Sequence, residues 1–166
     1  MAVALLVASA VAVTAWLGGR RPPVSLPAAD WVVVVKSART LSLLRDGQVI
    51  KTYPVALGRN PVGHKIREGD GRTPEGRYVL DWRNPNSRFH LSLHISYPNA
   101  ADRRHAQALG VSPGGDIMIH GQPNGLGWLG IMPQRDWTEG CIAVTNSAME
   151  EIWAAVAEGT PIDILP

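Results

Sequence analysis

The sequence predicts a mainly β domain with one or two short helices. Three observations favour this class: short β-branched or alternating segments recur along the chain, turn residues separate them, and helical signals are few. The length of 166 residues is about that of one domain. Hydrophobic content of 45% against charged content of 18% is typical of a protein that buries a core and keeps a cleft.

The expected strands are separated by residues with turn chemistry. They cover residues 32–36, 40–45, 48–57, 77–82, 89–97, 116–120 and 162–165. Asp46-Gly47 is a tight-turn signal between the second and third strands, and a charged, glycine-rich loop follows at 58–71. Thr73-Pro74-Glu75-Gly76 is a second turn. Together these features predict a mainly β domain.

Residues 89–97 show the clearest alternation in the chain. Apolar side chains are expected on one face of this strand, namely Phe89, Leu91, Leu93, Ile95 and Tyr97. The opposite face carries His90, Ser92, His94 and Ser96. This pattern predicts a half-buried strand.

Two segments have helical signals. Asn99 is expected to cap a helix that runs to Leu109 and ends at Gly110. Residues 147–150 have the form of a capping box and are expected to open a second helix that ends at Gly159. The core-facing stripe of this second helix is Met149, Ile152, Trp153 and Val156.

The N-terminus differs in composition from the rest. Residues 2–17 are nearly all apolar, so residues 1–19 are predicted to be a signal peptide or an N-terminal membrane anchor rather than a buried core helix. Residues 20–29 contain three prolines and are predicted to be a linker. Residues 30–166 would then form the single domain, exported to the periplasm or cell envelope, with an inner-membrane tether if the segment is retained.

Charge and cysteine content narrow the function classes. The formal net charge is +2, and no Lys/Arg run of the kind that binds nucleic acid is present. Cys141 is the single cysteine, so it forms no internal disulfide. A buried small side chain, a metal ligand and a nucleophile are all compatible with it. As a nucleophile it needs a base, because a free thiol is mostly protonated at neutral pH.

Five histidines are available as that base. His64 and His105 lie in charged segments and are expected at the surface, while His90 and His94 share the polar face of one strand. His120 ends a short apolar strand, and a long loop begins at the next residue. Strand ends are where rigid scaffolds present side chains to clefts, which favours His120.

The His120 and Cys141 segments together resemble the L,D-transpeptidase (YkuD-like) catalytic motif. The dipeptide His120-Gly121 is followed, after sixteen residues, by Thr138-Glu139-Gly140-Cys141, similar to the family's His-Gly and Ser/Thr-x-Gly-Cys signatures. Residues 73–78 and 93–98 also resemble the family's upstream turn and strands, so that the likeness covers most of residues 31–166.

The resemblance implies an L,D-transpeptidase-like β-sandwich that acts on peptidoglycan stem peptides. Cys141 would attack the carbonyl of the third-position diamino acid and expel the terminal D-Ala, with His120 as base. Backbone N–H groups around Gly140 and Cys141 would form the oxyanion site, and Thr138 and Gly121 would support it. The reaction implies no metal and no cofactor, and we expect a monomer.

Two departures from the family pattern bear on the acceptor. Glu139 stands where the family often has His, and Ala143 stands where it commonly has Arg. No Lys or Arg follows Cys141, so Arg88 or Arg135 would have to replace that Arg. Water could therefore replace the acceptor amine, which would make the protein a murein hydrolase, an endopeptidase or an L,D-carboxypeptidase.

Further residues are candidates for the substrate groove or for support of the base. The groove candidates are His94, Ser96, Trp128, Trp137 and Arg135, although both tryptophans also suit a loop packed on the core. Asp136 and Glu139 are candidates to orient His120, with solvent exposure as the simpler interpretation of each.

Other function classes fit the sequence less well. A sortase-like enzyme would need an Arg after the Cys, and papain-like peptidases place Cys before His. A zinc hydrolase would need convergent ligands, for which His94, His120 and Cys141 are the candidates. A cell-wall-binding module would be expected to lose Cys141 or His120, and both are present.

Overall fold

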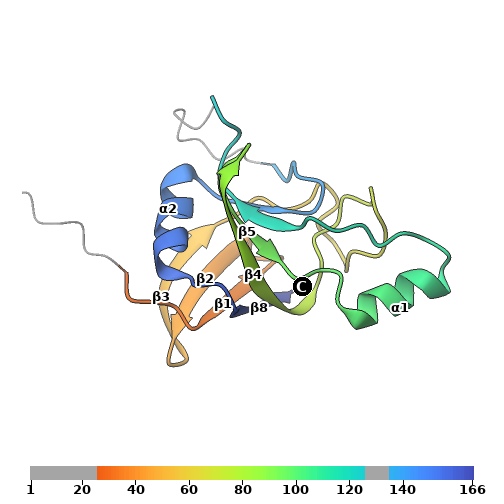
Figure 1. Cartoon of the computed structure of the whole chain (residues 1–166), viewed down its shortest axis with the longest axis horizontal. Coiled ribbons are helices and arrows are strands. Elements are labelled where there is room, and N and C mark those ends of the chain that lie inside the picture. The colour runs from red at the N-terminus through yellow and green to blue at the C-terminus, as the bar shows by residue number, and fades with distance from the viewer. Residues whose placement is uncertain (1–25, 126–134) are drawn as a thin grey trace, which may run out of the picture.

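The computed structural model describes residues 26–125 and 135–166 (Figure 1). Within these ranges the chain forms a single sheet of eight strands and two helices, which confirms the mainly β prediction. The elements are β1 Trp31–Val35, β2 Thr40–Arg45, β3 Gln48–Pro54, β4 Gly76–Ser87, β5 His90–Ile95, α1 Ala100–Ala108, β6 Met118–His120, β7 Ile142–Ala143, α2 Asn146–Ala155 and β8 Thr160–Leu165.

The N-terminal predictions fall mainly outside these ranges. The expected signal peptide or anchor and residues 20–25 of the expected linker are not among the described residues. In the part of the chain that the structure describes, no helix has the length and hydrophobicity to cross a lipid bilayer.

The sheet has the strand order β3-β2-β1-β8-β4-β5-β6-β7 and curls strongly (Figure 1). The pairs β1–β8 and β6–β7 are parallel, and the other pairs are antiparallel. Its two edges meet where Ala56, just after β3, exchanges two backbone hydrogen bonds of 2.9 and 2.8 Å with Ala143 of β7. The curl therefore protects both edges and brings the segment after β3 beside β7.

The core lies inside the curl and is built by alternating side chains. In β1 and β2, fully buried residues alternate with partly exposed ones, as the period of two in a strand requires. The predicted alternation at 89–97 holds for Leu93, Ile95 and Tyr97, which are buried. Phe89 lies before the start of β5 and is only partly buried. Aliphatic side chains of β8 and α2 complete this core, among them Ile162, Ile164, Met149 and Ile152.

Helix α1 begins where the sequence predicts. The Asn99 side chain accepts the backbone N–H groups of Ala101 and Asp102, and the Asp102 carboxylate accepts the N–H of Asn99. This full capping box satisfies donors that the first turn leaves without partners.

Helix α2 begins and ends earlier than predicted. Its cap is Thr145, whose hydroxyl accepts the N–H of Ala148 at 3.2 Å, so the capping box predicted at 147–150 is wrong. Thr145 lies only two residues beyond β7, so the turn that leaves this strand already caps the helix. The helix ends at Ala155 rather than near Gly159, because Val156 has an extended backbone and forms a bridge with Ala29.

Strand β4 is longer than predicted, and the added residues matter for the site. It runs to Ser87 because its first part pairs with β8 and its second part with β5. The second part carries Asn84 and Asn86 to the edge of the cavity described next.

Candidate active site

Cys141 and His120 reach one cavity from neighbouring strands. Strands β6 and β7 pair in parallel, with Ile119 opposite Ile142 and His120 opposite Ala143. Ile119 and Ile142 are fully buried in the core. Because successive side chains of a strand point to opposite faces, the residues before and after these isoleucines share the other face. His120 and Cys141 accordingly both line a cavity of about 590 Å³.

The His120 ring is held in a definite orientation. It is 4% exposed, and its Nδ1 lies 2.7 Å from the carbonyl oxygen of Gly121. Since a carbonyl only accepts, Nδ1 carries the proton and Nε2 keeps its lone pair. The rings of Phe89 and Trp137 lie 4.6 and 5.6 Å away between centroids. Burial lowers the pKa of the His120 imidazole, although the hydrogen bond to Gly121 opposes this, so the ring is neutral at pH 7.

The Cys141 thiol rests on the backbone around β6. The N–H of Met118 points to Sγ at 3.4 Å, and Sγ lies 3.6 Å from the carbonyl oxygen of Asp116. Burial raises the pKa of the thiol, while the Met118 N–H and the positive charge of Lys65 act against this rise. In the described residues no hydrogen bond joins Sγ to His120. Both pKa shifts thus favour a neutral thiol and a neutral imidazole in the resting site.

The residues before Cys141 form a strained turn. Gly140 has φ +130°, and a Cβ there would lie 2.6 Å from the carbonyl oxygen of Arg72, so only glycine fits. The Thr138 hydroxyl accepts the N–H of Gly140 at 3.1 Å and donates to the carbonyl of Cys141 at 2.7 Å. The Thr138 hydroxyl thus bridges the backbone on both sides of this turn. The Gly140 N–H already has a partner, which leaves the N–H of Cys141 as the oxyanion candidate.

The small size of Gly121 allows a close approach to its neighbours. A Cβ at this position would lie 2.7 Å from Asn146 Oδ1 and 3.0 Å from His90 Cβ. The close approach lets the Gly121 carbonyl turn toward the His120 ring, while Asn146 Oδ1 accepts the N–H of Gln122 at 2.7 Å. The dipeptide thus orients the imidazole and anchors the loop that follows.

Some of the groove candidates line the cavity and others do not. Trp137 lines the cavity, as does Arg88 from the turn between β4 and β5. Arg135 does not line it. His94 Nδ1 lies 2.6 Å from an Asp81 carboxylate oxygen, and His94 does not line this cavity. Trp128 lies outside the described residues.

Ser96 and the two acidic candidates also have other partners. The Ser96 hydroxyl accepts the N–H of Val79 at 2.9 Å, away from the cavity. Asp136 forms an ion pair with Arg39 at 2.7 Å, and Glu139 forms one with Arg59. Neither carboxylate contacts His120, so the expectation that one of them orients the base is wrong. The Gly121 carbonyl has that place.

A second cavity next to Cys141 was missed by sequence reasoning. It has a volume of about 410 Å³, and Asp116, Glu139 and Cys141 line both this cavity and the first. Lys65 and Glu68, from the loop after β3, complete its charged lining. This loop is more than seventy residues from Cys141 in the sequence, and only its high charge content hinted at a role.

The zinc interpretation lacks a ligand cluster. No three His, Cys, Asp or Glu side chains of residues 26–125 and 135–166 are grouped so as to hold one metal ion. His94, His120 and Cys141 do not form such a group. The cavity therefore presents a thiol, an imidazole with a free Nε2 and backbone N–H groups.

Comparisons with known proteins agree with this geometry. The family model described as the L,D-transpeptidase catalytic domain (YkuD) matches residues 29–164. The chain is 31% identical over 133 residues to the Escherichia coli (strain K12) protein named "Putative L,D-transpeptidase YafK", covering 76% of this chain and 46% of that protein. It thus spans about half the length of this curated relative.

Two solved structures show the same fold. The helical cell shape determining protein Pgp2 from Campylobacter jejuni has a TM-score of 0.62 and 27% identity, with 84% of this chain and 50% of that chain covered. An L,D-transpeptidase from Mycobacterium smegmatis has a TM-score of 0.54 and 16% identity, with 83% and 59% covered. By the extent of the family match, the chain belongs to the L,D-transpeptidase (YkuD) catalytic-domain family.

Proposed function

We propose that the protein is a cysteine acyltransferase of the L,D-transpeptidase type that acts on peptidoglycan stem peptides in the periplasm or cell envelope. The observation that carries the proposal is that Cys141 and His120 line one cavity. The contact of His120 with the Gly121 carbonyl uses Nδ1, so it leaves Nε2 available to accept a proton. Membership of the family supports the substrate class.

In the first half-reaction, His120 Nε2 takes the Sγ proton as the sulfur attacks the carbonyl carbon of the third-position diamino acid. The carbonyl oxygen becomes an oxyanion, for which the N–H of Cys141 is the proposed donor. The tetrahedral intermediate then breaks its C–N bond. The terminal D-Ala leaves as an amine after it accepts the proton from His120, and a thioester remains on Cys141.

In the second half-reaction an acceptor amine attacks the thioester and gives its proton to His120 Nε2. The C–S bond breaks, an amide forms, and the thiol is restored with that proton. Two cavities meet at Cys141, which supports separate sites for donor and acceptor peptides. This arrangement favours transfer of the acyl group to an amine. Transfer to water would instead give the hydrolytic products of an endopeptidase or an L,D-carboxypeptidase.

Mass analysis of stem tetrapeptides incubated with the protein tests the proposal. We expect loss of one D-Ala and a product joined to a second stem peptide, with activity of Cys141→Ala lower by about a thousandfold or more. Thermal unfolding of the variant is the control for folding. Equal turnover by Cys141→Ala would refute the assignment of the nucleophile. Binding of peptide without turnover by the wild type would instead indicate a wall-binding module.

A further inference from the structure

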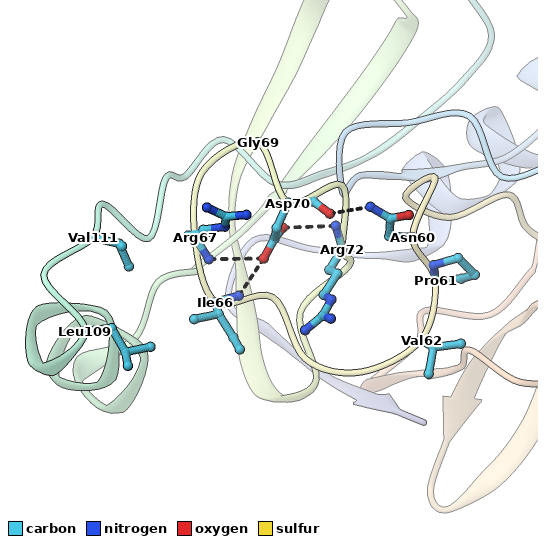
Figure 2. Close-up of a pocket in the computed structure, with 10 residues that line it drawn as sticks. All are labelled: Asn60, Pro61, Val62, Ile66, Arg67, Gly69, Asp70, Arg72, Leu109 and Val111. Atoms are coloured by element: carbon cyan, nitrogen blue, oxygen red, sulfur yellow. Dashed lines mark hydrogen bonds between the residues drawn. The ribbon is translucent and has the colours of Figure 1, made fainter.

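A further cavity lies away from the thiol. It has a volume of about 700 Å³ and lies between the loop after β3, residues 58–72, and the chain that leaves α1 (Figure 2). Neither Cys141 nor His120 lines it. It shares Gly69 with the second cavity beside Cys141, so only the rim of one loop separates the two. We name this space the outer cavity.

The carboxylate in the wall of the outer cavity is already saturated with donors. Asp70 Oδ1 accepts from Lys65 Nζ and from the N–H of Arg72, both at 3.0 Å. Oδ2 accepts the N–H groups of Ile66 and Arg67 at 2.8 and 3.1 Å, and Figure 2 shows these backbone bonds converging on Asp70. A carboxylate offers about four lone-pair sites, so Asp70 has none left for a guanidinium.

Two guanidinium groups at the outer cavity consequently lack a counter-charge. Within residues 26–125 and 135–166, neither Arg67 nor Arg72 forms an ion pair. The Arg72 guanidinium makes one long hydrogen bond, of 3.4 Å, to the carbonyl of His64. Its side chain extends into the ring formed by the loop (Figure 2). The partly buried Arg72 retains most of its five N–H donors for a ligand.

Aliphatic side chains form the rest of the wall. Pro61 and Val62 lie on one side of Arg72, and Leu109 and Val111 lie on the other (Figure 2). Val62 is 83% exposed and Leu109 is 55% exposed, which is high for large apolar side chains beside a cavity. Two guanidinium groups beside aliphatic side chains suit a ligand that has an anionic end and aliphatic groups.

We propose that the outer cavity binds the carboxylate end of a short peptide with small aliphatic side chains. Arg72 and Arg67 receive the carboxylate through paired N–H bonds, a geometry that the planar guanidinium suits. Methyl groups of the peptide pack against Val62 and Leu109. A phosphate polymer would satisfy the arginines but would leave the aliphatic wall in water, so a peptide is favoured. The inference rests on the proposed function, since it makes the outer cavity a remote subsite for a stem peptide.

Binding of D-alanyl-D-alanine to Cys141→Ala protein tests this inference without any turnover. We expect saturable shifts of the methyl NMR signals of Val62, Ile66, Leu109 and Val111 with the free dipeptide and no such shifts with its C-terminal amide. Inorganic phosphate is the third probe. Shifts of equal size and affinity with phosphate would show an adventitious anion site only and would overturn the inference. Equal binding of the amide, or shifts confined to the methyl groups of Met118 and Thr138 in the first cavity, would overturn it as well.

Charge-removing variants locate the carboxylate. Arg72→Met and Arg67→Met are each expected to raise the dissociation constant about tenfold, because each removes a charge-assisted hydrogen-bonding pair. Arg67 is exposed, so its variant keeps the test valid even where Arg72→Met fails to fold. Arg104→Met is the matched control, since Arg104 is exposed on α1 and outside the outer cavity. Unchanged affinity in both test variants would refute the inference and leave the proposed function untouched.

Discussion

Two buried clusters of this protein handle ionisable groups in opposite ways. At Asp70, burial alone would raise the pKa of the carboxyl, but backbone N–H groups of Ile66, Arg67 and Arg72 and the ammonium of Lys65 outweigh it and lower the pKa to about 2. At Cys141 and His120, burial dominates, and both groups are held in their neutral forms. Several hydrogen-bond donors reach the Asp70 carboxylate, whereas at Cys141 and His120 desolvation outweighs the few contacts that oppose it.

This contrast suits different tasks. An ionised Asp70 with four donors fixes the shape of a long loop whose backbone packs directly on the turn before Cys141. Under the proposed function, a neutral pair at Cys141 and His120 carries no charge until the sulfur attacks the substrate carbonyl carbon. The loop thus contacts the turn before Cys141, and under the proposed function His120 acts as the general base for the Cys141 thiol.

Removal of the Asp70 carboxylate is expected to have the largest effect on stability. Asp70→Ala leaves the ammonium of Lys65, which is 3% exposed, buried without its partner, and it leaves three N–H groups without an acceptor. We expect the free energy of unfolding to fall by about 3–5 kcal/mol, measured by chemical denaturation.

The control for Asp70 is a surface pair of similar length. Glu150, 61% exposed, lies 3.0 Å from His90, and Glu150→Ala is expected to cost less than about 1 kcal/mol. If both variants lost a similar free energy of unfolding, the buried Lys65–Asp70 pair would stabilise the protein no more than a surface pair does.

An added methyl group at Gly140 is expected to have a smaller effect, in the other cluster. Gly140→Ala brings Cβ against the backbone of Arg72 and forces a non-glycine residue to φ +130°, so we expect a loss of roughly 2–3 kcal/mol in thermal or chemical unfolding. Gly115→Ala is the matched control, because a Cβ there meets no atom within 4 Å. Equal stability of the two variants would contradict the close contact between the loop and the turn.

The pH dependence of thiol alkylation tests whether Cys141 and His120 are both neutral at rest. Of the effects expected here, this one is the smallest in energy. Because burial raises the pKa of Cys141, the thiolate fraction at pH 7 is below that of a free thiol. The rate of reaction with iodoacetamide should rise continuously with pH, with a midpoint above pH 9.0. Glutathione measured in parallel is the reference. A plateau of fast alkylation between pH 6 and 8 would reveal a preformed thiolate–imidazolium pair instead.

Local sequence signals predicted a large part of the fold. The residue limits of β2, the turn at Asp46-Gly47 and the cap at Asn99 depend on neighbours along the chain, and the structure places them as expected. The start of α2 was missed because Thr145 and Ser147 are both good capping residues, and the end of β7 decides between them.

The candidate site also has parts that local sequence predicts and parts that it does not. The His120-Gly121 and Thr138-Glu139-Gly140-Cys141 segments could be proposed as the reactive segments from sequence, because each motif is contiguous along the chain. The structure brings both segments to one cavity. The roles proposed for His94, Ser96 and Asp136 could not be checked from sequence, since their actual partners are Asp81, Val79 and Arg39 on other segments.

The sequence by itself determined which side chains can react and where the chain turns, because these properties depend on residue types a few positions apart. Only the tertiary structure decided that Lys65 and Cys141 line one cavity and that Asp70 accepts four hydrogen bonds. It also decided that Arg67 and Arg72 form no ion pair within residues 26–125 and 135–166. The burial of a group and the number of its hydrogen-bond donors depend on residues from distant parts of the chain. They are therefore set only when the sheet has curled and the loop after β3 has packed against it.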